Sequence, residues 1–172
     1  MRSPGHPASS GFSLLELAVS LTLIGACLLA LLDRVLFYQE LAEKARMEYT
    51  ATTLKLALQL RVGTLMAEGR RIDYPALARE NPVAWLERPM AGYAGEVTAD
   101  QPARLAGGSW YFDRPRAELV YVVDLDRHFS SGGEAGGRVR WHVQLVRPFG
   151  QPATDMTAVG ARFVSVAPYR WF

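Results

Sequence analysis

Glu16 is an acidic residue inside a long apolar run near the start of the chain. The run from Phe12 to Leu32 reads FSLLELAVSLTLIGACLLALL and contains no other charged side chain. With a rise of ~1.5 Å per residue, a helix of this length is roughly 30 Å long, which is enough to cross a bilayer. Because a carboxylate in hydrocarbon costs on the order of a few kcal/mol, we expect Glu16 to pair with a cation.

The other side chains that could bind or react cluster in a glycine-rich loop at residues 126–137 and just before it. Four oxygen donors there suit Ca²⁺, but their spacing matches no EF-hand and a solvated loop is the preferred interpretation; they are Asp124, Asp126, Ser130 and Glu134. His128 lies near Ser130 and Ser131, as in a hydrolase, yet no nucleophile elbow accompanies them. The segment SSGGEAGG also lacks the lysine of a phosphate-binding loop. We therefore predict no catalytic residue, no metal site and no cofactor.

Arginines close to aromatic residues suggest a nucleic-acid surface as a weaker alternative. The residues concerned are Arg138, Arg140, Arg147, Trp110, Tyr111 and Trp141. The 172-residue chain has a net charge of +2 and no run of four basic residues, so its composition does not indicate a polyanion-binding protein. Cys27 is the only cysteine, which excludes an intramolecular disulfide and cysteine-based metal motifs.

The segment MRSPGHPASSG before the apolar run is short, polar and free of acids. Arg2 and the α-amino group put positive charge in front of the run. This predicts a cytoplasmic N-terminus and places the residues after Leu32 on the other side of the membrane. The apolar run is too long for an ordinary secretory signal peptide, and small residues precede it.

The sequence GFSLLELAVSLTLIGACLLALL resembles the N-terminal segment of type IV pilins and of the pseudopilins of type II secretion systems. The resemblance implies that a prepilin peptidase on the cytoplasmic side cleaves between Gly11 and Phe12 and methylates the new N-terminal residue, Phe12. Glu16 then corresponds to the family's glutamate at the fifth mature position, and Gly25 to a glycine that loosens the helix. Many members have a proline where this chain has Asp33, so no proline kink is expected.

Such processing would give Glu16 a partner, because cleavage creates an α-amino group one helical turn away. The carboxylate would neutralise that amine in its own chain or in a neighbouring subunit, and in low dielectric such pairing is strong. Assembly would then form a helical bundle around apolar side chains that include Leu14, Leu15, Leu17, Leu21 and Ile24. The alternative is a signal anchor whose glutamate reaches the lipid headgroups.

Residues 33–68 predict a continuation of this helix. They contain no proline, and apolar residues recur at three- to four-residue spacing at Leu54, Leu58, Val62 and Leu65. Gly69 and the two arginines after it predict the helix end. Residues 72–108 are expected to be irregular, with short helical turns at 75–79 and 82–87. Within them we expect core-sealing side chains at Trp85, Leu86, Met90 and Tyr93.

After Gly108 the hydrophobic period changes to two. Four strands are predicted, at residues 109–113, 118–125, 138–149 and 160–169. In the third, Val139, Trp141 and Val143 alternate with polar residues, so one face is expected to be buried. The predicted fold class is α+β and pilin-like: a long N-terminal helix packed against a C-terminal antiparallel sheet of about four strands.

These features predict a cytoplasmic leader at residues 1–11, a transmembrane and assembly helix at 12–32, and a periplasmic or extracellular globular domain at 33–172. The expected function is that of a non-enzymatic subunit of a pilus or pseudopilus, a minor pilin or pseudopilin because the cysteine pair of common major pilins is missing. Its expected partners are prepilin peptidase, other pilin or pseudopilin subunits, the inner-membrane assembly platform and membrane lipid. The alternatives are a signal-anchored periplasmic enzyme or ligand-binding domain, and a DNA-uptake or adhesive subunit at a pilus tip.

Overall fold

A computed structural model describes residues 13–98, 105–132, 137–147 and 158–172. The chain forms two compact units, and the boundary between them in the sequence lies between Gln39 and Glu40. Helix α1, Leu14–Ala67, contains residues of both units. The predicted long helix is therefore confirmed, and its bounds agree with the expected ones to within two residues at each end.

The end of α1 is a Schellman motif, in which two backbone bonds satisfy carbonyls of the last turn. The N–H of Gly69 donates to the carbonyl of Met66 at 3.0 Å, and the N–H of Arg70 donates to that of Leu65 at 3.1 Å. This geometry needs a residue in the left-handed region, and Gly69 has a φ of +66°. The sequence prediction of a stop at Gly69 is thus explained by the conformational freedom of that glycine.

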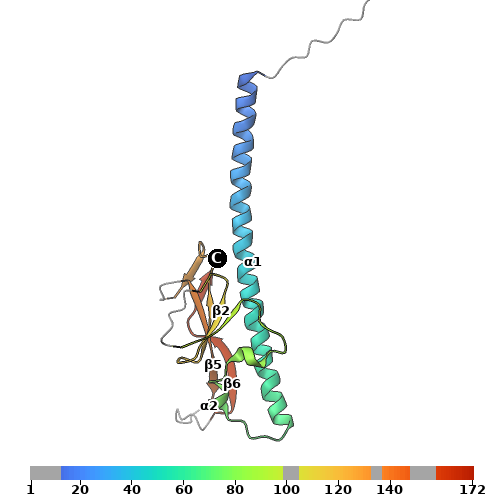
Figure 1. The fold of residues 1–172 in the computed structure, drawn as a ribbon, viewed down its shortest axis with the longest axis vertical. Coiled ribbons are helices and arrows are strands. Elements are labelled where there is room, and N and C mark those ends of the chain that lie inside the picture. Colours follow the sequence, from blue (N-terminus) through green and yellow to red (C-terminus); the bar gives the residue numbers. More distant parts are fainter. Residues whose placement is uncertain (1–12, 99–104, 133–136, 148–157) are drawn as a thin grey trace, which may run out of the picture. The chain divides into compact units, whose positions relative to one another are not determined.

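In the second unit, α1 buries one stripe of side chains against a sheet (Figure 1). The stripe recurs every three or four residues, as one side of a helix requires, and consists of Met47, Ala51, Leu54 and Leu58. The facing side of the sheet contributes alternate residues of its strands, as a pleated strand dictates. These buried sheet residues include Trp110, Phe112, Leu119, Tyr121, Val139, Trp141, Val143 and Phe163. The predicted α+β arrangement of helix on sheet is confirmed.

The main sheet has five strands in the order β1-β2-β3-β5-β6. They are β1 (Tyr93–Val97), β2 (Trp110–Asp113), β3 (Glu118–Val122), β5 (Arg138–Val146) and β6 (Gly160–Ser165). The last four are the predicted strands, and they pair antiparallel. The expectation of four strands, all antiparallel, was wrong in one respect: β1 is a fifth strand and pairs parallel to β2. Its sequence YAGEV is short and contains Gly95, which weakens the strand signal.

A second, two-stranded sheet was not predicted. It pairs β4 (Phe129–Ser131) with β7 (Tyr169–Trp171) in antiparallel register. The segment predicted as one strand at 160–169 is divided, because β6 ends at Ser165 and β7 begins after Pro168, which has no N–H to donate. The loop expected at 126–137 likewise contains β4.

In the sequence between α1 and β1 there are two short helical elements, and a side chain caps the N-terminus of each. The first is α2 (Tyr74–Leu77), where the Asp73 carboxylate accepts a hydrogen bond from the N–H of Ala76. The second is the 3₁₀ helix η1 (Pro82–Trp85), where the Asn81 side chain accepts a hydrogen bond from the N–H of Val83. Both predicted helical turns are confirmed, although shorter than expected. The four predicted core-sealing residues here are partly buried and pack against the core.

Candidate functional site

The predicted processing residues Gly11 and Phe12 lie outside the described residues, which begin one position later. Ser13 precedes the first helical residue, and its hydroxyl oxygen accepts a hydrogen bond from the N–H of Glu16 at 3.2 Å. A serine followed three residues later by a glutamate is the sequence pattern of a capping box. Ser13 was not singled out from the sequence, although this pattern could have identified it.

Glu16 lies in the first turn of α1 and is exposed. The N-terminal end of a helix carries partial positive charge, which stabilises a carboxylate there by about 0.3–1 kcal/mol at an exposed position. This interaction does not replace a full countercharge. Among the described residues, no hydrogen bond or ion pair of the Glu16 carboxylate was found.

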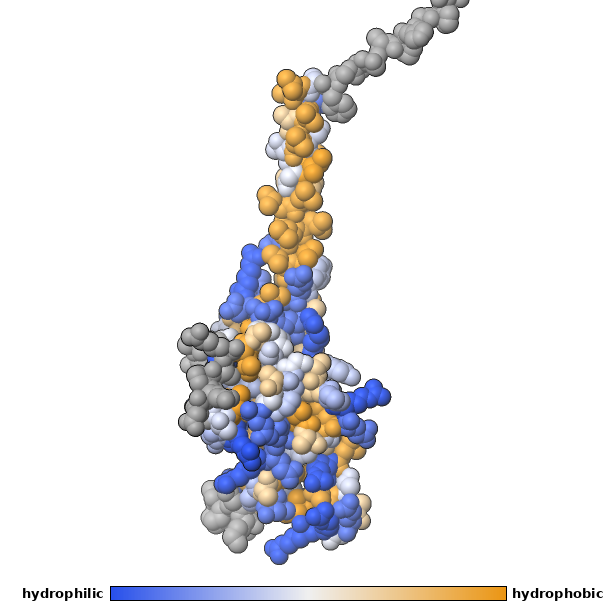
Figure 2. All heavy atoms as spheres, in the orientation of Figure 1, coloured by the Kyte–Doolittle hydropathy of each residue, from blue (hydrophilic) through white to orange (hydrophobic). Residues whose placement is uncertain are grey.

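The predicted assembly residues form an exposed apolar surface on the N-terminal part of α1. Five of them are 48% to 86% exposed: Leu14, Leu15, Leu17, Leu21 and Ile24. Other large apolar side chains of this part are also exposed, and apolar residues cover most of the face of this segment that is seen in Figure 2. Exposed apolar surface of this extent marks a membrane or protein interaction site. The helix is long and apolar enough to span a membrane.

One polar side chain within this apolar segment, Thr22, has a local partner. The hydroxyl of Thr22 donates to the carbonyl of Ala18 at 2.8 Å, which satisfies it without water. The helix is continuous through Gly25, and a Cβ added at this position would have no neighbouring atom within 4 Å. The carboxylate of Glu16 is therefore the side chain of this segment with the greatest need of an external partner.

A pair of buried carboxylates, Glu40 and Glu43, was missed by the sequence prediction. They are only 2% and 5% exposed, and they continue the buried stripe of α1 toward its N-terminus. The signal was present in the spacing, because positions 40, 43, 47, 51 and 54 fall on one side of a helix. An acid at such a position must find hydrogen-bond donors in the fold.

Glu43 receives three donors from β3 and from the loop after it. The hydroxyl of Tyr121 donates to Oε1 at 2.9 Å, and the N–H groups of Asp124 and Leu125 donate to the two carboxylate oxygens at 2.8 and 2.9 Å. Burial and the neighbouring Glu43 carboxylate raise the pKa of Tyr121 well above its usual value. The hydroxyl therefore keeps its proton and remains a donor to Glu43.

Glu40 also receives three donors. The backbone N–H of His128 donates to Oε1 at 2.8 Å, the indole N–H of Trp171 donates to the same oxygen at 3.0 Å, and Nδ1 of His128 lies 2.7 Å from Oε2. Burial alone raises the pKa of the Glu40 carboxyl, but the hydrogen bonds from His128 and Trp171 outweigh this effect and leave the pKa below its usual value. The carboxylate is thus held ionised inside the fold.

The loop that was weighed as a calcium or hydrolase site serves these carboxylates instead. Its backbone N–H groups at 124, 125 and 128 point to Glu40 and Glu43, and the His128 ring binds Glu40. Glu134 lies outside the described residues. Within the described ranges, no group of three or more His, Cys, Asp or Glu side chains is arranged to hold a metal ion.

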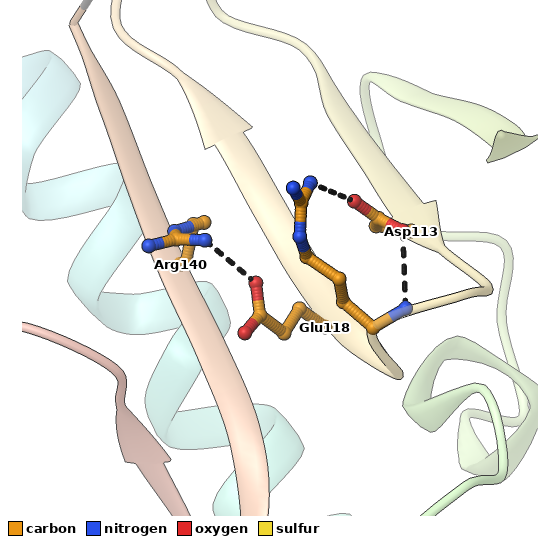
Figure 3. A network of polar contacts seen from close by, with 4 residues as sticks. Asp113, Glu118 and Arg140 are labelled. Atoms are coloured by element: carbon orange, nitrogen blue, oxygen red, sulfur yellow. Dashed lines mark hydrogen bonds and ion pairs between the residues drawn. The ribbon is translucent and has the colours of Figure 1, made fainter. Parts of the chain in front are cut away.

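The arginines weighed as a nucleic-acid surface lie on or near the outer face of the sheet. Arg140 on β5 forms an ion pair with Glu118 on β3 at 3.1 Å, next to the turn where Asp113 binds Arg116 (Figure 3). The three aromatic rings that accompany these arginines in the sequence, Trp110, Tyr111 and Trp141, are buried. Stacking on bases requires exposed ring faces, so these rings do not provide them.

A small pocket lies between β4, β5 and the turn before β7. Its lining includes Ser131, Arg138 and Tyr169, and its volume is about 10 Å³. That volume is at the lower limit for one water molecule. The pocket is therefore too small for an organic ligand in this conformation.

Comparisons with protein-family models, with curated proteins and with solved structures found no match to this chain.

Proposed function

We propose that this protein is a pilin-like subunit that is processed at its N-terminus and assembles through its first helical segment into a pilus or pseudopilus. The observation that carries the proposal is Glu16, an exposed carboxylate in the first turn of a helix segment that is otherwise apolar on all sides. The sequence around it, GFSLLEL, resembles the prepilin processing segment.

The free energy of transferring apolar side chains out of water favours burial of this segment, either in an assembly or in a membrane. Transfer of one leucine side chain from water to an apolar environment is worth about 1.5–3 kcal/mol, and the segment exposes many such side chains. An assembly of these helices, or a bilayer, removes that surface from water. In either environment Glu16 needs a countercharge, since an unpaired buried carboxylate is costly.

Cleavage between Gly11 and Phe12 would supply the countercharge as the new α-amino group of Phe12. Glu16 would pair with it in the same chain or in the next subunit, and pairing between subunits would set their axial spacing. The N-methyl group keeps this amine basic, so the charge would remain. In this mechanism Leu14, Leu15, Leu17, Leu21 and Ile24 provide the apolar contacts.

The second unit, residues 40–172, would present the partner-specific surface of the subunit in the periplasm or beyond. Its helix-on-sheet core holds the two buried carboxylates and needs no disulfide among its residues, since Cys27 lies outside it. The lack of a cysteine pair favours a minor pilin or pseudopilin. Prepilin peptidase, other subunits and the inner-membrane assembly platform are the proposed partners.

Mass spectrometry of the N-terminus tests the processing step. The chain expressed in a host with active prepilin peptidase is expected to begin at N-methylated Phe12, and a Gly11→Ala variant is the processing-deficient control. An intact N-terminus beginning at Met1 in the same host would overturn the proposal and favour a signal-anchored domain.

Substitution of Glu16 tests assembly separately from processing. Glu16→Ala is expected to be cleaved normally but to be incorporated into filaments at least tenfold less efficiently than the unaltered chain. Cys27→Ala lies in the same apolar segment and changes no charge, so it is the matched control and should be incorporated normally. Equal incorporation of the two variants would contradict the pairing role of Glu16.

A further inference from the structure

The C-terminal strand β7 is attached to α1 by three charged side chains spaced four residues apart. Glu40 accepts from the indole N–H of Trp171 at 3.0 Å, and Lys44 donates to the Trp171 carbonyl at 3.0 Å. The Glu48 carboxylate lies close enough to the Tyr169 hydroxyl to contribute, after burial, to raising the pKa of Tyr169. A spacing of four places these side chains on one side of the helix. The C-terminal strap, defined as residues 128–132 with 169–172, is therefore anchored along two turns of α1.

The strap has little stability of its own. Its two strands, β4 and β7, share only three residue pairs, and an isolated two-stranded sheet is marginally stable in water. The rings of Phe129 and Trp171 pack edge to face with centroids 5.1 Å apart, and the His128 and Phe172 rings lie 5.1 Å apart. The remaining stability comes from packing of Trp171, Phe129 and Tyr169 against the hydrophobic core and from the contacts with α1.

Glu40 is the contact on which both halves of the strap converge. Its carboxylate binds His128, which precedes β4, and Trp171, which ends β7. The Nδ1–H of an imidazole donates to a carboxylate whether or not the ring is charged, whereas a protonated carboxyl is a poorer acceptor and carries a donor of its own. Protonation of the Glu40 carboxyl therefore weakens its contacts with both halves of the strap.

We propose that Glu40 is an acid-sensitive latch, whose protonation releases the C-terminal strap from α1 while the five-stranded sheet remains folded. The inference does not depend on the proposed function, because all of its groups lie within residues 40–172. The strap is expected to open before the sheet because β2, β3, β5 and β6 are held by longer ladders than the one that joins β4 to β7. Strand β5 pairs through residues 138–142 with β3 on one side and through residues 141–146 with β6 on the other.

The direction of the pH dependence follows from the lowered pKa of Glu40. Its usual value is 4.5, so the stabilisation is complete above about pH 4.5 and is lost as the pH falls through the lower value of the folded protein. Other charged groups lie on the elements that surround Glu40. They are Glu43, Lys44 and Glu48 on α1, Asp124, Asp126, Arg127 and His128 on the loop, and Arg170 on β7.

Amide hydrogen exchange of the full chain in detergent tests the latch, with each rate divided by the intrinsic rate at the same pH. As the pH falls below about 4.5, protection of the strap is expected to drop roughly tenfold or more before protection of β5 changes. Loss of protection in both segments at the same pH would overturn the proposal.

A Glu40→Gln variant imitates the protonated latch at neutral pH. Both carboxylate oxygens face donors, so either orientation of the glutamine amide places an N–H₂ group against one of them. The strap of this variant is expected to be at least about tenfold less protected at pH 7, with β5 unchanged. Glu68→Gln, an exposed position whose carboxylate pairs only loosely with Arg70 at 3.5 Å, is the control and should behave like the unaltered chain. A Glu40→Gln strap as protected as that of the control would refute the latch.

If Glu40→Gln fails to fold, Trp171→Phe provides the second variant. It keeps an aromatic ring at the end of β7 but removes one of the donors to Glu40. Its strap is expected to open at a higher pH than that of the unaltered chain, because the loss of a donor reduces the depression of the Glu40 pKa. An unchanged or lower opening pH would contradict the proposal.

Discussion

Glu16 in the first half of α1 has opposite surroundings to those of Glu40 and Glu43 in the second half. In the first half, Glu16 is exposed on a segment covered with apolar side chains. In the second half, Glu40 and Glu43 are buried, and each receives three hydrogen bonds from its own chain. A carboxylate in apolar surroundings needs donors or a cation in both cases. The difference is that the fold supplies donors to Glu40 and Glu43, whereas no hydrogen bond or ion pair of the Glu16 carboxylate was found among the described residues.

The apolar residues of the two halves of α1 also differ in their exposure. Leucines in the second half that face the sheet are fully buried, while those in the first half are exposed on all sides. Substitutions in the second half should therefore change the stability of the folded unit. Substitutions in the first half should change association with a membrane or with other subunits.

The largest expected effect is that of Leu54→Ala. Leu54 is 0% exposed, so its truncation should lower the free energy of unfolding by about 2–5 kcal/mol. Leu56→Ala, two residues away and 55% exposed, is the matched control and should change stability by less than about 0.5 kcal/mol. Urea unfolding of the full chain in detergent, followed by tryptophan fluorescence, measures both. Similar losses for the two variants would show that the assigned helix face is wrong.

A smaller effect is expected for Glu43→Gln, compared with Glu16→Gln. The amide cannot accept all three donors that Glu43 accepts, so the free energy of unfolding should fall by about 1–3 kcal/mol. Glu16→Gln should leave the unfolding of residues 40–172 unchanged and should affect only assembly. The same urea titration distinguishes them, and a destabilised Glu16→Gln would break the contrast between the two halves.

The smallest effect concerns Tyr121→Phe, which removes one donor to Glu43. We expect a loss of about 0.5–1.5 kcal/mol at pH 7. Because burial and Glu43 raise the pKa of Tyr121, its contribution is complete below about pH 10 and is lost as the pH rises through the higher value of the folded protein. The variant should therefore show a flatter decline of stability in alkali than the unaltered chain. Unfolding followed between pH 8 and about 11.5 measures the slope.

The sequence was sufficient to predict the elements in which a hydrophobic period extends over many consecutive residues. The period of α1 and the stop at Gly69 were sufficient for the helix, and the alternation in β5 was sufficient for its buried face. Strands β1, β4 and β7 are three to five residues long and contain glycine, serine or arginine. Their strand conformation depends on partners distant in the sequence, which local propensity does not report.

The carboxylates described under the candidate site were also identified only in part from the sequence. Glu16 was identified because it is the single charge in an apolar run. Glu40 and Glu43 were missed because they lie among other charged residues of the helix, and only their position relative to Met47 and Leu54 distinguishes them. Their donors, on β3, on the following loop and on β7, are 78 to 131 residues away, so no local pattern indicated them.

The hydrogen bond between Glu40 and Trp171 has a consequence for the order of folding. The two residues are separated by 131 positions, so synthesis from the N-terminus produces the acceptor long before its donor. Closing so long a loop costs conformational entropy, and contacts of this kind form late and slow the folding of a domain. Until the last residues have been made, the N-terminal end of the unit therefore exposes an unfilled binding site for β7.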